Sequence, residues 1–316
     1  MFESLFNTAP WWAWSGFHLL VVVMLALDLG VFNRDTHAPG LREAAWWSAV
    51  WIMLALVFNV VVWKGMGSLK AAEFLTGYLL EKSLSVDNLF VFILLFTAFQ
   101  VPARNQHRIL YWGVVGAMVL RAVMIAAGIT LLNRFSWMMF VFGAFLVYTG
   151  IKMLVMREHE AADPRRGGLA RAFQQVMPFD PDGGYTHFWV TRNGRHYATP
   201  MLLLLVIVEV TDLVFAVDSI PAVLSVTRDP FLAYTSNIFA ILGLRSLYFL
   251  LARMMDRFHL LKVGLAVILS FVGVKMCIAK LVEIPILASL LVIALILAVC
   301  VAGSLVWPKA EGGKSV

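Results

Sequence analysis

Long apolar runs separated by short polar or turn-forming segments fill the chain from residue 12 to residue 307. Each run is long enough to form an α-helix of about 20 residues, the length that crosses the hydrocarbon core of a bilayer. The pattern therefore predicts an all-α, polytopic membrane protein with nine transmembrane helices in a single transmembrane domain, residues 1–316. The predicted spans are 12–32, 42–63, 71–98, 106–132, 135–156, 199–227, 230–255, 260–281 and 284–307.

One long polar stretch, residues 157–198, interrupts this apolar pattern. It contains the segments AADPRRGG, PFDPDGG and TRNGR, in which proline, glycine, aspartate and asparagine favour turns. We expect a loop with a short hairpin at its end, linking two halves of the transmembrane domain.

Composition also favours a membrane protein and excludes a soluble enzyme. Hydrophobic residues make up 61% of the 316 residues, charged residues only 14%, and the mean hydropathy is +0.84. Cys277 and Cys300 stand alone in different predicted spans, so the sequence offers neither a disulfide framework nor a thiolate metal cluster. The first span lacks a preceding basic segment and is long enough to span, so we expect it to remain as a helix.

Lysine and arginine are distributed unevenly between the two sides of the predicted helices. The connections on the N-terminal side hold five of them, whereas those on the opposite side hold fifteen. Because basic residues accumulate in cytoplasmic loops, the N-terminus is predicted outside, and the 157–198 loop and the C-terminus in the cytoplasm. The excess of 25 basic over 19 acidic residues reflects this topology, so nucleic acid is not an expected partner.

Acidic side chains interrupt two of the apolar spans. The third span contains Glu81 and Asp87, and the sixth contains Glu209, Asp212 and Asp218. A charged side chain at the centre of a membrane helix costs about 2.5–3.5 kcal/mol on insertion scales, so it usually marks an ion pathway, a proton relay or a charge partner. We therefore expect the functional site in these two spans.

Charged positions recur in the same order in two parts of the chain. The matched pairs, separated by 131, 124 and 123 residues, are Asp87 and Asp218, Arg121 and Arg245, and Lys152 and Lys275. Spans three to five (71–156) are thus predicted to repeat as spans six to eight (199–281), and because three is odd the second unit is inverted. Inverted repeats with a site near the membrane midplane are a recurrent transporter design, in which we expect the third and sixth spans to cross as antiparallel partners.

Helical geometry separates the acids within each span. A separation of six residues, as between Asp212 and Asp218, leaves two side chains roughly 120° apart, whereas seven residues nearly close two turns. Asp212 and Ser219 are therefore predicted to share a face. Pro221 lacks a backbone donor, and we expect it to break the sixth span after Asp218 and to free carbonyl ligands.

Two interpretations of the buried acids remain open. In the first, they neutralise the basic residues inside the spans, with Glu81 and Asp212 paired to Arg121 and Arg245. The basic residues inside spans are Lys82, Arg121, Lys152, Arg245 and Lys275.

In the second interpretation, Asp87 and Asp218 bind an ion together with the polar residues that follow them, Asn88 and Ser219. All the donors near these positions are oxygens, and no histidine lies beside them. Such a set favours a hard divalent ion such as manganese, calcium or magnesium over copper or zinc.

The motifs around these acids resemble those of the TerC family of membrane proteins, especially its Alx-like branch. The resemblance covers about residues 15 to 307 through the segments FLTGYLLEKSLSVDNLFVF, VFGAFLVYTGIKML, ATPMLLLLVIVEVTDLVFAVDSIPAV and TSNIFAILGLRSLYFLL. It implies a bacterial inner-membrane protein that exports manganese, with exchange for protons as a subsidiary expectation. The candidate residues that it implies are Glu81, Asp87, Asn88, Glu209, Asp212, Asp218 and Asn237.

Other functional classes remain as alternatives to transport. The protein could assist the metal loading or maturation of exported and membrane proteins, or contribute to tellurium resistance, for which the family is named. An intramembrane aspartyl protease is disfavoured because neither Asp87 nor Asp218 has the GxGD context. We expect no enzymatic activity and no cofactor, with the manganese ion and the lipid bilayer as partners.

The predicted topology is tested with reporter fusions at the C-terminus. Since basic residues favour a cytoplasmic C-terminus, a fluorescent protein fused there should fold, and alkaline phosphatase should be inactive. An active C-terminal phosphatase would refute this orientation, and with an even number of spans the repeat would need to be redrawn.

Overall fold

The computed structural model describes residues 9–32, 40–135, 137–155, 168–192, 194–252, 260–279, 281–282 and 284–306. The side chains of some helical residues, including Asp28 and Asp87, also lie outside the described part. The fold is all-α with one small hairpin, as predicted. The helices are α2 (Trp11–Phe32), α3 (Leu41–Met66), α4 (Ser68–Ala98), α5 (Ala103–Arg134), α6 (Met138–Val155), α7 (Gly168–Val176), α8 (Pro200–Leu224), α9 (Pro230–Leu242), α10 (Leu244–Ala252), α11 (Leu261–Ile278) and α12 (Ile286–Val306).

Helices occupy each of the nine predicted segments, but their lengths differ. Among the described residues, four helices are long and apolar enough to cross a membrane, and α9 with α10 makes a fifth if this bent pair is one span. The four are Leu41–Met66, Asn105–Arg134, Pro200–Leu224 and Ile286–Ser304. Helix α4 is longer than most of these and carries Glu81, Lys82 and Asp87 in its middle. The structure therefore supports a polytopic membrane protein, and nine crossings remain a prediction.

The polar stretch folds into more structure than the sequence predicts. Strands β1 (Trp189–Arg192) and β2 (Arg195–Ala198) form the expected antiparallel hairpin. Helix α7 precedes it and was not predicted, because nine residues beginning with glycine lie in a segment rich in turn-forming residues. The Tyr185 hydroxyl donates to the Phe99 carbonyl at 2.6 Å, and an Arg108 guanidinium N–H donates to the Thr186 carbonyl at 2.6 Å. These bonds attach the segment before the hairpin to the end of α4 and to the first turns of α5.

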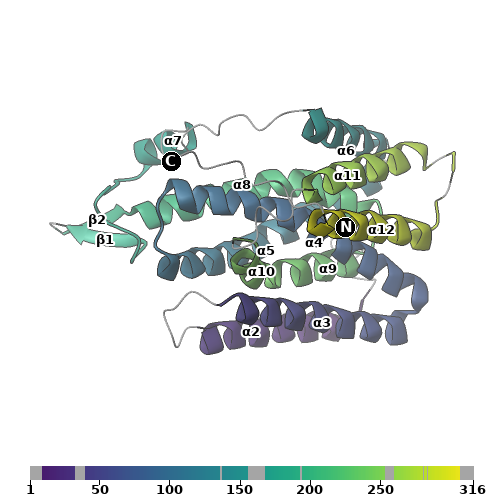
Figure 1. Ribbon diagram of the computed structural model, residues 1–316, viewed down its shortest axis with the longest axis horizontal. Helices are drawn as coiled ribbons and strands as arrows, with labels where there is room; N and C mark the ends of the chain where they lie inside the picture. Colours follow the sequence, from purple (N-terminus) through teal and green to yellow (C-terminus); the bar gives the residue numbers. More distant parts are fainter. Residues whose placement is uncertain are drawn as a thin grey trace.

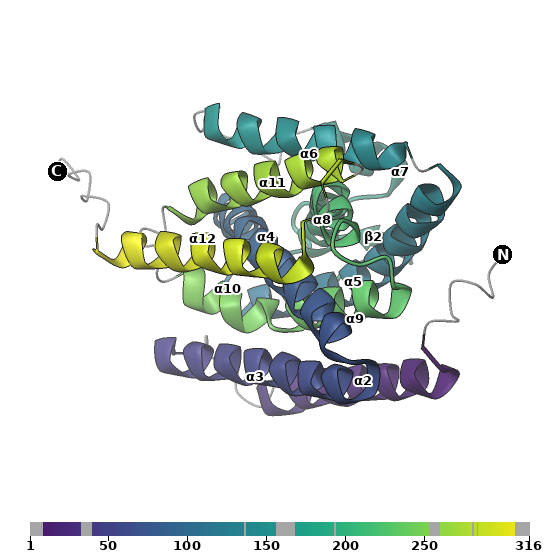
Figure 2. The same cartoon turned by 90° about the vertical axis from the view of Figure 1, so that its right-hand side faces the viewer.

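The helices form a central group flanked on two sides (Figures 1 and 2). Helices α2 and α3 lie along one side of the group formed by α4, α5, α8, α9 and α10, while α6 and α11 lie along the opposite side. Helix α12 packs against α4 and α11. The charged segments of α4 and α8 are thus enclosed by apolar helices.

The helix contacts follow the pairing that the predicted repeat requires. The first unit contains α4, α5 and α6, and the second contains α8, α9 with α10, and α11. Helix α4 of the first unit packs on α9 of the second, and α8 of the second unit packs on α5 of the first, which is the equivalent contact. The third and sixth spans, α4 and α8, also contact each other directly, as do α6 and α11. In an inverted repeat these last two pairs lie on the axis that relates the units.

Close contacts between α6 and α11 agree with the same repeat. A Cβ atom at Gly143 would lie 2.8 Å from the Gly273 carbonyl oxygen, and one at Gly150 would lie 2.6 Å from the Ala266 carbonyl oxygen. The 123-residue separation of Lys152 and Lys275 maps Gly143 onto Ala266 and Gly150 onto Gly273. Each contact is therefore the image of the other, and the small residues let the two backbones approach closely.

The break in the transmembrane helices lies at a different residue from the one predicted. Helix α8 continues through Pro221 to Leu224, so the expected break after Asp218 is wrong. Pro221 lies in the last turn of α8, and because it has no N–H it removes one helical hydrogen bond. The helical pattern continues after it, since the Ser225 N–H donates to the Pro221 carbonyl at 3.0 Å. The break instead separates α9 from α10 at Gly243, where the axis bends by 42°.

The α6–α11 contact predicts a position-specific effect of added side-chain volume. Gly143→Val places methyl groups against the α11 backbone and should destabilise the protein by about 1–3 kcal/mol, the usual cost of overpacking. Gly16→Val in α2 is the matched control, since nothing lies within 4 Å of a Cβ atom at Gly16. The measurement is the thermal midpoint of the purified proteins in detergent, and equal losses from both variants would contradict the close contact.

Candidate functional site

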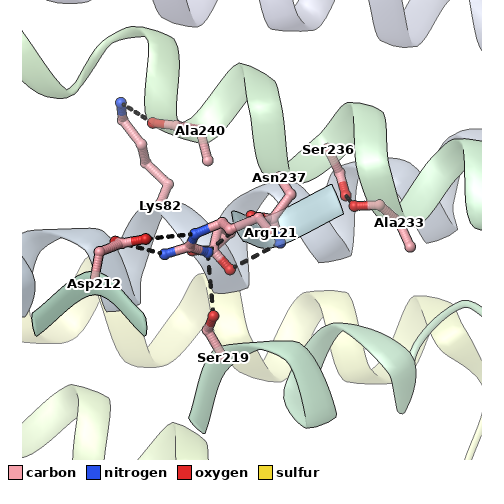
Figure 3. A network of polar contacts seen from close by, with 9 residues as sticks. Lys82, Arg121, Asp212, Ser219, Ala233, Ser236, Asn237 and Ala240 are labelled. Atoms are coloured by element: carbon pink, nitrogen blue, oxygen red, sulfur yellow. Dashed lines mark hydrogen bonds and ion pairs between the residues drawn. The ribbon is translucent and has the colours of Figure 1, made fainter. Parts of the chain in front are cut away.

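Arg121 lies at the centre of a buried polar cluster between α4, α5, α8 and α9 (Figure 3). Its side chain is 0% exposed, as are those of Glu81 and Asn237, and Asp212 is 4% exposed. Helix α5 carries Arg121 inside an otherwise apolar stretch, VVGAMVLRAVMIAAG, so the packing that buries the apolar face also buries the guanidinium. A buried charge of this kind requires partners.

The guanidinium holds two carboxylates from different helices. Its Nε and Nη2 groups donate to the two Asp212 oxygens at 3.3 and 3.2 Å, a bidentate pair. Its Nη1 group forms a hydrogen bond and ion pair with Glu81 on the other side. One arginine of α5 therefore joins α4 to α8.

Two neutral side chains complete the cluster. Arg121 Nη1 also donates to Asn237 Oδ1 at 2.8 Å and to Ser219 Oγ at 3.2 Å. The Asn237 amide nitrogen in turn donates to Glu81 Oε2 at 3.2 Å, which closes a ring of three residues. Four of the sequence-predicted site residues, Glu81, Asp212, Ser219 and Asn237, are thus bound by a single cation.

These contacts resolve part of the pairing hypothesis. The predicted pairing of Glu81 with Arg121 is confirmed, and so is the shared face of Asp212 and Ser219. The predicted pairing of Asp212 with Arg245 is wrong for the described part of the chain, because the contacts of Asp212 there are with Arg121. The bidentate geometry explains this choice, since one guanidinium satisfies both oxygens.

Lys82 places a second positive charge beside this cluster. Its ammonium donates to the carbonyl oxygen of Ala240 at 3.2 Å, in the last turn of α9 before the break (Figure 3). Gly243 makes room for it, because a Cβ atom there would lie 3.0 Å from Lys82 Nζ. The C-terminal end of a helix is the favourable place for a cation.

Asp218 lies apart from the Arg121 cluster. Its carboxylate is half-buried and accepts a hydrogen bond from Thr149 Oγ1 of α6 at 3.3 Å, whereas the neighbouring Ser219 faces Arg121. The side chain of Asp87 lies outside the described residues, so its predicted role beside Asp218 is untested. Within the described set, no three His, Cys, Asp or Glu side chains are placed to hold a metal ion.

Two further sequence-predicted residues carry buried polar atoms without a partner among the described residues. Asn88 is 3% exposed and its amide nitrogen has no acceptor. Glu209 packs its carboxylate directly against Gly116 of α5, and its Oε2 atom has no donor. Buried polar groups of this kind are costly and are uncommon in folded proteins unless a ligand or function uses them.

Comparison with known proteins identifies the family. The chain matches the family model described as the integral membrane protein TerC family over residues 66–311. It belongs to the TerC family. The resemblance found in the charged motifs is thereby confirmed over most of the chain.

Relatives align with this TerC-family protein almost end to end. An uncharacterized membrane protein of Myxococcus xanthus is 50% identical over 293 residues, covering 93% of this chain and 92% of the relative. A protein of Escherichia coli K12 with the provisional name membrane-bound redox modulator Alx is 48% identical over 286 residues, covering 88% and 89%. No solved structure matches the TerC-family chain.

Sequence reasoning missed several residues of the TerC-family site. Thr149, Ala240 and Gly243 were not among the candidates, although Gly243 leaves a detectable signal as a lone glycine inside an apolar span. Lys82 was considered only as a partner for an acid, and its acceptor is a backbone carbonyl. A discontinuous helix next to buried charges is the arrangement that transporters use for ion sites.

The Arg121 cluster of this TerC-family protein predicts a large loss of stability when the cation is removed. Arg121→Gln leaves two buried carboxylates without their charge partner, which should cost about 3–5 kcal/mol. Folded yield and thermal midpoint in detergent are the measurements, and Arg121→Gln combined with Asp212→Asn should recover part of the loss.

The control for this prediction is Arg192→Gln. Arg192 pairs with Asp180 at 2.8 Å, and because the Arg192 side chain is 57% exposed while Asp180 is buried, the loss should be smaller than that from Arg121→Gln. Equal losses from Arg121→Gln and Arg192→Gln would contradict the central role of Arg121.

Proposed function

We propose that this TerC-family protein is a secondary transporter that exports divalent manganese from the cytoplasm across the bacterial inner membrane, in exchange for protons. The observation that carries the proposal is that Asp218, a half-buried acid inside a membrane-length helix, lies apart from the acids that Arg121 binds, in a protein whose α9 and α10 form a bent helix pair. Charged groups inside a membrane protein mark ion pathways, and broken helices supply the carbonyl ends that such pathways use.

The proposed metal ligands are Asp218 and Asp87. Asp218 accepts a hydrogen bond from Thr149 of α6. The 131-residue separation pairs Asp218 with Asp87 of α4, so the proposal takes Asp87 as the second ligand. Two carboxylates balance the charge of a divalent ion, and hard oxygen donors suit manganese.

Exchange for protons follows from the same carboxylates. A carboxylate must be deprotonated to bind a metal ion, so metal binding releases protons and proton binding releases metal. Glu209, whose Oε2 atom lacks a donor among the described residues, is a further proton carrier in this proposal. The Arg121 cluster then serves to hold α4, α5 and α8 together during transport.

The competing function is a non-transporting role, including the redox role that the provisional name of the E. coli relative suggests for that protein. Purified protein in liposomes separates these functions. Under the transport proposal, liposomes with an internal metal indicator take up manganese, and take up calcium and magnesium more slowly. Manganese flux equal to that of protein-free liposomes, from protein shown to be folded, would refute the proposal.

The carboxylate site predicts the behaviour of two variants in this assay. Asp87→Asn and Asp218→Asn each keep the size and much of the polarity of the side chain while removing its charge, so both should reduce manganese flux to the level of protein-free liposomes. Asp182→Asn, the same change at an exposed loop residue, is the matched control and should transport normally. Wild-type flux from folded Asp87→Asn and Asp218→Asn would return these acids to a charge-pairing role.

A further inference from the structure

The ammonium group of Lys82 occupies a part-buried position at the carbonyl end of α9, called the niche below. The Ala240 carbonyl points to Lys82 Nζ at 3.2 Å, and α9 ends two residues later at Leu242. Trp51 of α3 forms another wall, since a Cβ atom at Gly243 would lie 3.0 Å from both Trp51 Cβ and Lys82 Nζ. Any residue larger than glycine at position 243 would narrow the niche.

The Ala240 carbonyl and the charges of the neighbouring cluster suit a cation at this place. Glu81 and Asp212 carry two negative charges when ionised, and Arg121 supplies one positive charge. Lys82 follows Glu81 on α4, and its ammonium brings this group of four to neutrality. The end of the broken helix adds a partial negative charge, because its last carbonyls lack intrahelical donors.

We propose that the carbonyl end of α9 is a monovalent-cation site that the protein keeps filled with the ammonium group of Lys82. Carbonyl ends of discontinuous helices bind sodium ions in transporters. Here a side chain of the same chain takes the place of such an ion. The inference does not depend on which ion the protein transports, and it implies that wild-type stability is independent of sodium and potassium beyond their effect on ionic strength.

The test is chemical rescue of Lys82→Ala. Removing the ammonium should empty the niche, and methylammonium, sodium or potassium should then refill it. The thermal midpoint of purified Lys82→Ala should rise by about 3 °C with each rescuing ion at ten times its dissociation constant. N-methylglucamine chloride, whose cation is too large for the niche, keeps the ionic strength constant in the reference samples.

Two variants separate the niche from general salt effects. Lys275→Ala removes a lysine from α11 whose Nζ donates to Ser289 Oγ at 2.8 Å, and this variant should show no rescue. Lys82→Ala combined with Gly243→Ala places a methyl group in the niche and should abolish rescue. If Lys82→Ala folds only with methylammonium present, unfolding on its removal is the expected result.

Other outcomes would overturn the inference. It fails if the midpoint of Lys82→Ala does not respond to the small cations, or if Lys275→Ala responds equally. Because the readout is thermal stability, a failure here leaves the transport proposal intact, and an absence of manganese flux leaves this inference intact.

Discussion

A single buried guanidinium holds carboxylates from two distant parts of the chain, and the arrangement of the central helices depends on it. Arg121 binds Asp212 through two nitrogens and Glu81 through a third, and all three side chains are buried. Two buried acids beside one base are stable only when each oxygen has a donor, so the cluster fixes both distance and rotation of α4, α5 and α8. Helix packing alone would tolerate a range of rotations.

The glycine contacts between α6 and α11 provide the complementary constraint. These helices contain few polar groups, and lipid offers no hydrophobic force to drive them together. At Gly143 and Gly273 the two backbones approach closely, so van der Waals contacts between them stabilise the pair. The protein thus combines two constraints. The Arg121 cluster fixes the rotation of the central helices, and close backbone packing holds α6 against α11.

Several features could be predicted from the sequence because they depend on local periodicity. The placement of the helical segments, the hairpin before α8, and the common face of Asp212 and Ser219 all follow from residue spacing. The repeat, which stays a prediction, also rests on spacing, because charged residues recur in the same order in the two units.

Other features depend on contacts between distant residues, which spacing does not reveal. Pro221 was expected to break its helix, but a proline in the last turn removes only one bond. The residue at the α9–α10 break is a glycine, and Lys82 and Trp51 from two other helices leave no room for a side chain there. Thr149 meets Asp218 only because α6 packs on α8.

The acid pair has a property that its arginine lacks. The 131-residue separation that relates Asp87 to Asp218 also relates Glu81 to Asp212, so the predicted repeat exchanges these two acids with each other. The same repeat carries Arg121 to Arg245, a different residue in a different helix. Glu81 and Asp212 are thus equivalent positions of the predicted repeat, whereas Arg121, which binds both, is equivalent to another residue, Arg245. Because both acids bind Arg121, the charge cluster does not share the two-fold relation that the predicted repeat gives to the helices around it.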